Sequence, residues 1–382
     1  MVMRAAASKI LIAAAVVFAA INLNNALHKG GDFEVFLQAG DRVRYAQPLY
    51  EGSWPGGGVL GPPFQGVFFV PFAALASVSA VAARVLWYAI GLSALAFGIV
   101  AWSRVDVSRR TMSWAALWSS PAVIWPALAI ALPAETNFEH QNMNPVLLAL
   151  TGFGALALAK RQDTTAGICV GIAAALKAFP ALLIGYFVVV RAWRAAATAL
   201  VVSAALTLSP MLFYGPSGAM ETLRAWTAIG HTGEWPSRPQ NQSLLAFWLR
   251  LGLEPSTAHM AFAVSAIVTV LLVWWGTRSR PADGPAGQRL AMAPSLAAAV
   301  LASPIAWDHY WVLMFPALQA CYSAGAFLPF WTGAVLITGL SPLTVGTHGF
   351  ALVRSWSNSA IAGLILAGSA AWNGPYKKKR PA

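Results

Sequence analysis

The sequence predicts an all-α, polytopic membrane protein that forms a single domain over residues 1–382. Of its residues, 58% are apolar and only 10% are charged, whereas a soluble domain carries about 25% charged residues. Apolar stretches of about 17 to 25 residues, the length that crosses a bilayer as a helix, recur from one end of the chain to the other. We therefore expect a bundle of about 10 to 12 transmembrane or re-entrant helices.

The basic residues predict how these helices are oriented. The formal net charge is +12, but the basic residues stand in short runs between apolar stretches, which is the positive-inside pattern and not a nucleic-acid-binding face. The runs are Lys160-Arg161, Arg191 with Arg194, Arg278 with Arg280, and Lys377 to Arg380. Placing them on the cytoplasmic side of the plasma (inner) membrane puts both termini in the cytoplasm, and residues 28–63 and 214–242 in two outer loops. The alternative for residues 1–27 is a cleaved signal peptide.

Two stretches depart from simple spanning helices. In residues 165–190 the run Lys177-Ala178-Phe179-Pro180 interrupts an apolar stretch. Because proline breaks a helix and disfavours helix in the preceding residue, we expect two half-helices that dip into the membrane and return. Between residues 64 and 132 the charge rule leaves two alternatives. Either residues 64–82 are re-entrant, or the span with Pro121, Pro126 and Pro133 is broken.

The cysteines and carboxylates suggest no metal. Cys169 and Cys321 both lie in apolar stretches, which is typical of a small buried side chain rather than of a disulfide or a metal ligand. No pair of carboxylates has metal-ligand spacing. We therefore expect neither a metal nor a cofactor.

The first outer loop contains the most informative carboxylate. Asp32 follows Gly30-Gly31 and precedes apolar residues at roughly helical spacing, which predicts an amphipathic helix on the outer membrane surface. These residues are Phe33, Phe36, Leu37 and Val43, with Gly40 on the same face. The helix N-terminus favours an ionised carboxylate, the form that a general base needs. Asp32 is alternatively only a helix cap, and Glu34 and Asp41 are rival carboxylates.

Three more polar clusters precede apolar segments on the outer side and are expected to surround one cavity with Asp32. They are His140, Gln141, Asn142 and Asn144; Gln240, Asn241, Gln242 and Ser243; and Asp308, His309 and Tyr310. The alternative is that they are interfacial caps. Lys177 differs, because a cation within an apolar stretch is a functional-site hypothesis by default. Its alternative is to extend its ammonium group to the cytoplasmic surface.

Four stretches, which together span almost the whole chain, resemble glycosyltransferase family 87, the polyprenol-phosphate-mannose-dependent mannosyltransferases of GT-C architecture. They are Gly31-Asp32-Phe33 followed by Pro48-Leu49-Tyr50 and Pro62-Pro63-Phe64; Gly167 to Pro180; Asn241-Gln242-Ser243-Leu244; and Ser303 to Tyr310.

The resemblance implies a membrane glycosyltransferase with a polyprenyl-phosphate-sugar donor, a lipid or glycan acceptor that enters from the outer side, and Asp32 as the base. It also implies inversion, which gives an α-glycoside from a β-linked donor. Displacing a lipid phosphate needs a base, cationic or N–H donors for the leaving group, and exclusion of water. We expect those donors to be His309, Lys177, Asn241 and Gln242. The expected cavity residues are His140, Gln141, Asn142, Trp307, Asp308, Tyr310 and Tyr50, and Asp308 is a candidate partner that orients His309.

The sequence departs from the family pattern in two places. Several members carry two adjacent histidines where this chain has His309-Tyr310, which leaves the role of the second position open. Glu139 to Asn142 stand where relatives often show Gly-Gln. The expected sugar is therefore a hexose, and this departure weakens the assignment of mannose in particular. The alternative function is a flippase or transporter of lipid-linked sugars. Transporters usually show internal repeats and charge near the midplane, whereas here the polar residues concentrate at outer ends.

Overall fold

The structure is a computed structural model that describes residues 16–50, 58–229, 237–279 and 291–373. Within these ranges every regular element is a helix, and the only β pairing is an isolated antiparallel bridge between Asn241 and Trp307. The prediction of an all-α fold is therefore confirmed.

The first half of the chain contains a helical stretch at residues 16–28, which is followed, in the described residues, by eleven helical elements. These are α2 (Asp32–Arg44), α3 (Phe64–Val78), α4 (Ala80–Ser103), η1 (Val107–Arg109), α5 (Trp114–Trp118), α6 (Pro121–Ala129), α7 (Ala131–His140), α8 (Asn144–Ala159), α9 (Asp163–Leu176), η2 (Phe179–Ala181) and α10 (Leu182–Val189). The second half follows with α11 (Trp193–Thr207), α12 (Met211–Ile229), α13 (Leu244–Arg250), α14 (Pro255–Arg278), α16 (Met292–Leu301), the 3₁₀ helix η4 (Asp308–Met314), α17 (Phe315–Ser323), α18 (Phe327–Ala334), the π-helical η5 (Val335–Gly339), α19 (Pro342–Ser355) and α20 (Asn358–Asn373).

Few of the apolar helices are long. In the described ranges, α4 and α14 are each long and apolar enough to cross a bilayer alone, and two bent pairs reach that length together: α11 with α12 at 95°, and Phe327–Gly339 with α19 at 84°. The other apolar helices have 10 to 17 residues: α3, α8, α9, α16, Phe179–Val189 and Asn358–Trp372. The polytopic helical bundle is confirmed, but many of its members are shorter than the roughly 20 residues of an ordinary span.

Both irregular stretches have a clear form in the structure. The segment with Pro121, Pro126 and Pro133 is divided into α6 and α7, with Ile130 outside helical geometry between them. This is the break that one alternative requires, and the re-entrant course of residues 64–82 stays a prediction. The break in residues 165–190 is confirmed: α9 ends at Leu176, Lys177 is extended (φ −142°, ψ 136°), and Pro180 lies in η2 before α10 begins. The path of these two half-helices across the membrane stays a prediction.

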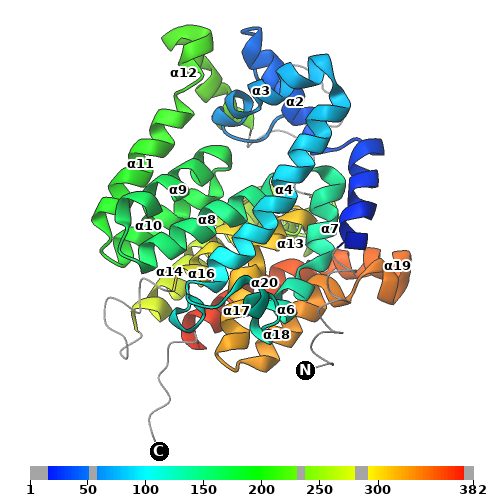
Figure 1. The fold of residues 1–382 in the computed structure, drawn as a ribbon, viewed down its shortest axis with the longest axis vertical. Coiled ribbons are helices and arrows are strands. Elements are labelled where there is room, and N and C mark those ends of the chain that lie inside the picture. The colour runs from blue at the N-terminus through cyan, green and yellow to red at the C-terminus, as the bar shows by residue number, and fades with distance from the viewer. Residues whose placement is uncertain (1–15, 51–57, 230–236, 280–290, 374–382) are drawn as a thin grey trace, which may run out of the picture.

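The apolar spacing predicts an amphipathic helix, and α2 is one, but it buries its apolar face against α3. Phe33, Phe36, Gly40 and Val43 are buried. Gly40 permits the contact, because a Cβ at this position would lie 2.5 Å from the carbonyl oxygen of Phe69 in α3. Figure 1 shows α2, α3 and α12 together at one end of the molecule, where the Tyr214 hydroxyl donates a 2.8 Å hydrogen bond to the Gln47 carbonyl. Helix α2 and the residues that follow it to Tyr50 therefore pack on protein, and their place on the outer membrane surface stays a prediction.

The orientation predicted from the basic runs can be tested with two matched cysteines. Gln47 and Gln162 are both exposed, and they lie in the first outer loop and in the Lys160-Arg161 loop respectively. In a background with Cys169→Ala and Cys321→Ala, Gln47→Cys should react with a membrane-impermeant maleimide on intact cells. Gln162→Cys should react only after the membrane is permeabilised, because the positive-inside rule places its loop in the cytoplasm. The reverse labelling pattern would invert the topology.

Candidate active site

A cavity of about 1540 Å³ lies between α2, α7, the α9–α10 break, η4 and α19. Most of the side chains predicted for the site line it, although they come from four distant parts of the sequence. They are Asp32, His140, Asn142, Lys177, Trp307, Asp308, His309 and Tyr310.

Asp32 is the first residue of α2, but it is not the cap of this helix. The N-cap is Gly31, whose N–H donates to the Glu34 carboxylate. The carboxylate of Asp32 instead accepts a 2.6 Å hydrogen bond from Nδ2 of Asn142, and its side chain is 35% exposed. Asp32 is therefore held by a partner across the cavity and still reaches the open space. Of its rivals, Glu34 pairs with Arg84, and Asp41 does not line the cavity.

Gly31 allows α2 to begin this close to α7. A Cβ at Gly31 would lie 2.9 Å from both the Cα and the carbonyl oxygen of His140. Any other residue would push the start of α2 away from the end of α7, and with it Asp32 away from Asn142. At the neighbouring Gly30, a Cβ would meet only the flexible Glu34 carboxylate, at 3.8 Å.

Lys177 is buried at the break between α9 and α10, with 7% of its surface exposed. Its Nζ donates to Oδ1 of Asn142 at 3.0 Å and to Oδ1 of Asn144 at 2.9 Å, and it lies 3.7 Å from the centroid of the Tyr310 ring. Two amide oxygens and a cation–π contact satisfy a charge that burial otherwise makes costly. The ammonium group therefore points into the site and not to the cytoplasmic surface, and Asn142 joins it to Asp32.

Asn137 and Asn144 hold Asn142 and His309 in place through further hydrogen bonds. Nδ2 of Asn144 donates to the His309 carbonyl at 3.1 Å and to Oδ1 of Asn137 at 3.2 Å, and Nδ2 of Asn137 donates to the Asn142 carbonyl at 3.0 Å. Asn137 is absent from the predicted set, and the only signal for it is the clustering of three asparagines at the end of α7 and the start of α8. Gln141 lies between these helices in the left-handed region (φ 51°), and it donates to the Ala26 carbonyl instead of lining the cavity.

His309 faces Asp32 without bonding to it. Nε2 lies 3.6 Å from Oδ2 of Asp32, too far for a hydrogen bond, and this buried nitrogen has no hydrogen-bond partner among the described residues. The His140 ring lies 5.7 Å away, centroid to centroid. Burial, together with the charges of Lys177 and His140, lowers the pKa of His309 well below its ordinary value, so the imidazole is neutral. Nε2 is thus available to a ligand.

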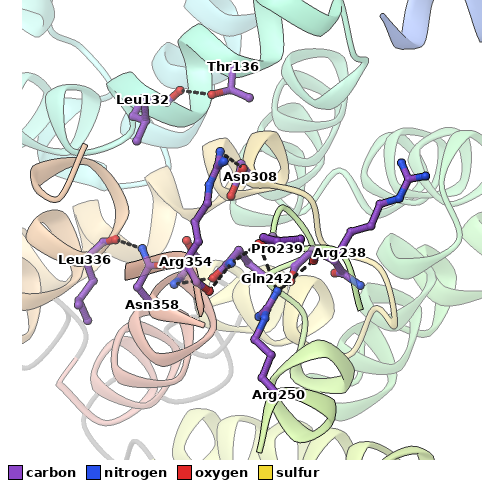
Figure 2. A network of polar contacts seen from close by, with 12 residues as sticks. Leu132, Thr136, Arg238, Pro239, Gln242, Arg250, Asp308, Leu336, Arg354 and Asn358 are labelled. Carbon is purple, nitrogen blue, oxygen red and sulfur yellow. Dashed lines mark hydrogen bonds and ion pairs between the residues drawn. The ribbon is translucent and has the colours of Figure 1, made fainter. Parts of the chain in front are cut away.

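Asp308 does not orient His309, which is the role considered for it from the sequence. Its carboxylate forms an ion pair with Arg354 of α19, and no hydrogen bond joins it to the neighbouring imidazole within the described ranges (Figure 2). Burial raises the pKa of Asp308 to about 7, although the charges of Arg354 and Arg250 act in the opposite direction. Arg354, which sequence patterns did not indicate, lines the same cavity.

Asn241 and Gln242 lie beside the site and hold its backbone. Both are fully buried and neither lines the cavity. Oδ1 of Asn241 accepts from the Ala306 N–H at 2.9 Å, and Nε2 of Gln242 donates to the carbonyls of Pro239 and Arg354 at 2.8 and 3.0 Å. These contacts fix the segment that leads into η4, and direct donor binding by the two amides stays a prediction without geometric support. Tyr50 is also outside the cavity, where its hydroxyl donates to the Gly61 carbonyl at 2.7 Å.

The described residues contain no group of three or more His, Cys, Asp or Glu side chains that could hold a metal ion. The chemistry that the cavity does offer is a partly exposed carboxylate beside a neutral imidazole, with a buried ammonium one amide away from the carboxylate. That set suits deprotonation of a hydroxyl next to an anionic leaving group.

Comparisons with known proteins point to one family. The sequence profile of glycosyltransferase family 87 matches residues 60–304, which is more than half of the chain and includes Lys177 but neither Asp32 nor His309. A polyprenol-phosphate-mannose-dependent α-(1-2)-phosphatidylinositol mannoside mannosyltransferase of Mycolicibacterium smegmatis is 28% identical over 308 residues, covering 72% of this chain and 68% of the relative. Its namesake in Mycobacterium tuberculosis is 27% identical over 307 residues, covering 75% and 69%.

Among solved structures, the crystal structure of ArnT from Cupriavidus metallidurans bound to undecaprenyl phosphate aligns with 96% of this chain and 77% of its own, at a TM-score of 0.46 and 17% identity. The extent of the family match and the two mannosyltransferase relatives agree with the resemblance seen in the sequence motifs. The chain therefore belongs to glycosyltransferase family 87 and is a membrane glycosyltransferase.

Proposed function

We propose that this enzyme transfers mannose from a polyprenyl-phosphate-mannose donor to a hydroxyl group of a lipid or glycan acceptor on the outer face of the plasma membrane. The names of the two relatives support the donor and the sugar. The observation that carries the proposal is the carboxylate of Asp32, held in the cavity by Asn142 and facing the unpartnered nitrogen of His309.

Asp32 is the general base in this mechanism. Its exposed oxygen accepts the proton of the acceptor hydroxyl while the hydroxyl oxygen attacks the anomeric carbon, and the bond from that carbon to the phosphate oxygen breaks. Asn142 joins this carboxylate to the buried Lys177, because its Nδ2 donates to Asp32 and its Oδ1 accepts from Nζ of Lys177. One displacement by one base inverts the anomeric centre, so a β-linked donor gives an α-mannoside.

His309 acts on the donor side. A neutral imidazole donates one N–H, and its Nε2 lies in the cavity without a hydrogen-bond partner among the described residues, where it can reach an oxygen of the donor phosphate. Lys177 is already bound to two amide oxygens and the Tyr310 ring. Its contacts support a role in fixing Asn142 and in adding positive potential, rather than a direct bond to phosphate.

The acceptor approaches past α7. Glu135, Glu139 and His140 line the cavity on this helix, and Glu139 forms a 2.6 Å ion pair with the exposed Lys29. Carboxylates in such a position accept hydrogen bonds from sugar hydroxyls. The relatives are named for phosphatidylinositol mannoside acceptors, and a hydroxyl-rich lipid headgroup of this kind suits an acidic rim.

Replacing Asp32 tests the base. Asp32→Asn keeps an oxygen that accepts from Asn142 but removes the basic charge, so kcat should fall about 10²- to 10⁴-fold while expression and thermal stability stay unchanged. Transfer from polyprenyl-phosphate mannose to native lipid extract would be measured. The matched control is Asp41→Asn, which changes a carboxylate on the same helix outside the cavity. Full activity of Asp32→Asn with loss in Asp41→Asn would move the base to the rival position.

Replacing His309 tests the donor side. His309→Ala should lower turnover about 10²- to 10³-fold and raise the KM for the donor, because one hydrogen-bond donor to the leaving group is lost. The KM for the acceptor should not change. His309→Gln, which keeps an N–H donor at similar reach, should retain part of the activity. Wild-type turnover and donor KM in both variants would refute this role.

The two adjacent glycines test whether the site depends on the approach of α2 to α7. Gly31→Ala should lower kcat about 10²-fold, because a shift of about 1 Å in Asp32 spoils its alignment. Gly30→Ala should leave kcat within about two-fold, since its new methyl group meets only a flexible side chain. Steady-state kinetics of both variants, with thermal unfolding as a check on folding, would decide. Equal activities would show that the close approach does not position the base.

A further inference from the structure

Two consecutive residues at the start of η4 serve different parts of the cavity. His309 faces Asp32, whereas Asp308 faces α19 and binds Arg354. This divergence follows from the geometry of a 3₁₀ helix, in which neighbouring side chains point about 120° apart. The cavity therefore has a polar region that is separate from the proposed catalytic one, and both are attached to the same short helix.

Positive charge exceeds negative charge in this region. The guanidinium groups of Arg354 and Arg250 both act on the single carboxylate of Asp308. Arg250 is committed to the protein, because it donates to the carbonyls of Arg238 and Pro239 at 3.1 and 3.2 Å and also binds Ser357 (Figure 2). The side chains of Arg354 and Asp308 are partly buried, at 21% and 14% exposed, and Arg250 is partly buried beside them. Two cations with one carboxylate leave a positive charge that a second anion would compensate.

Arg354 is placed to receive such an anion. Within the described part of the chain, its guanidinium group donates only to Asp308, and it rests over the Phe350 ring at 4.2 Å. Both Arg354 and Phe350 line the cavity. Figure 2 shows the side chain reaching across the space between α19 and η4, whereas Arg238, also labelled there, extends in a different direction. A guanidinium that rests over a ring keeps its remaining N–H groups available to a planar or tetrahedral oxyanion.

We propose that Arg354 is the anchor of a second anion subsite, which binds the phosphate group of a lipid substrate, with Asp308 as the partner that occupies it in the unliganded enzyme. The ligand is a phosphate monoester or diester on a lipid, and both the polyprenyl donor and a phosphatidylinositol-type acceptor carry this group. On binding, the phosphate shares or takes over the guanidinium group from Asp308. The subsite rests on the proposed lipid-phosphate substrates, but its test does not require turnover.

The competing explanation is that the Asp308–Arg354 pair only ties α19 to η4. The two explanations predict opposite results for the two halves of the pair. If the ion pair only holds α19 against η4, removing either charge breaks it, and the two variants should change ligand affinity to a similar extent. If Arg354 is a phosphate ligand, removing Arg354 weakens binding, whereas removing the carboxylate of Asp308 eliminates its competitor.

Binding would be measured on full-length Asp32→Asn enzyme, with one substrate at a time so that no transfer can occur, in maltoside detergent that contains no phosphate. The probes are farnesyl phosphate for the donor arm and phosphatidylinositol for the acceptor arm, with farnesol as the control for the tail. In this background, Arg354→Gln should weaken one of the two phosphate ligands about 10- to 100-fold, as expected for lost charge-assisted hydrogen bonds. The ligand whose affinity falls, farnesyl phosphate or phosphatidylinositol, shows whether the subsite binds the phosphate of the donor or that of the acceptor. Asp308→Asn should bind that ligand as tightly as the parent or more tightly.

Arg354→Lys keeps the charge but loses the fork of donors, so its affinity should be intermediate. It also serves if Arg354→Gln does not fold. The control is Arg224→Gln, which removes an exposed arginine of α12 outside the cavity and should change neither arm. Unchanged affinity for both ligands in the Arg354 variants, or an equal loss in Asp308→Asn, would overturn the subsite. Failure of the proposed function would be a separate result: no transfer by the wild-type enzyme in the turnover assay.

Discussion

The site depends on the burial of one ammonium group among apolar helices. Lys177 is only 7% exposed, and an ammonium group without partners at such a place would be costly. The chain satisfies it with Asn142 and Asn144 from the start of α8 and with the ring of Tyr310 from η4. These partners can reach Lys177 only if α8, η4 and the α9–α10 break meet, so satisfying this charge also brings the catalytic candidates together.

Much of this arrangement could be predicted from the sequence, because its main residues are conspicuous in apolar surroundings. Lys177 beside Pro180 predicted a broken helix, and Asp32 before an apolar helical pattern predicted the start of α2. Asn241 and Gln242 were equally conspicuous, yet their amides bind backbone groups around η4. A polar residue at a membrane entrance can bind a ligand or support the backbone, and composition does not separate these uses.

Arg354 could not be found in this way. It is 46 positions from Asp308 in the sequence, and it lies in a segment whose helix is bent 84° from the preceding one. Only the bend turns α19 back over the cavity and brings the two charges into contact. Asn137 was missed for a related reason, because its contribution is to hold another side chain and not to face the cavity.

The shortness of the helices has a consequence for the lipid around the enzyme. At 1.5 Å per residue, the 15 residues of α3 span about 22 Å, whereas the hydrocarbon core of a bilayer is about 30 Å thick. Where such a helix crosses the bilayer, the mismatch is relieved by local thinning of the membrane. A thinner hydrocarbon layer at this side of the protein would bring the plane of lipid headgroups closer to the cavity. A lipid phosphate would then reach Asp32 and His309 with little dehydration on the way.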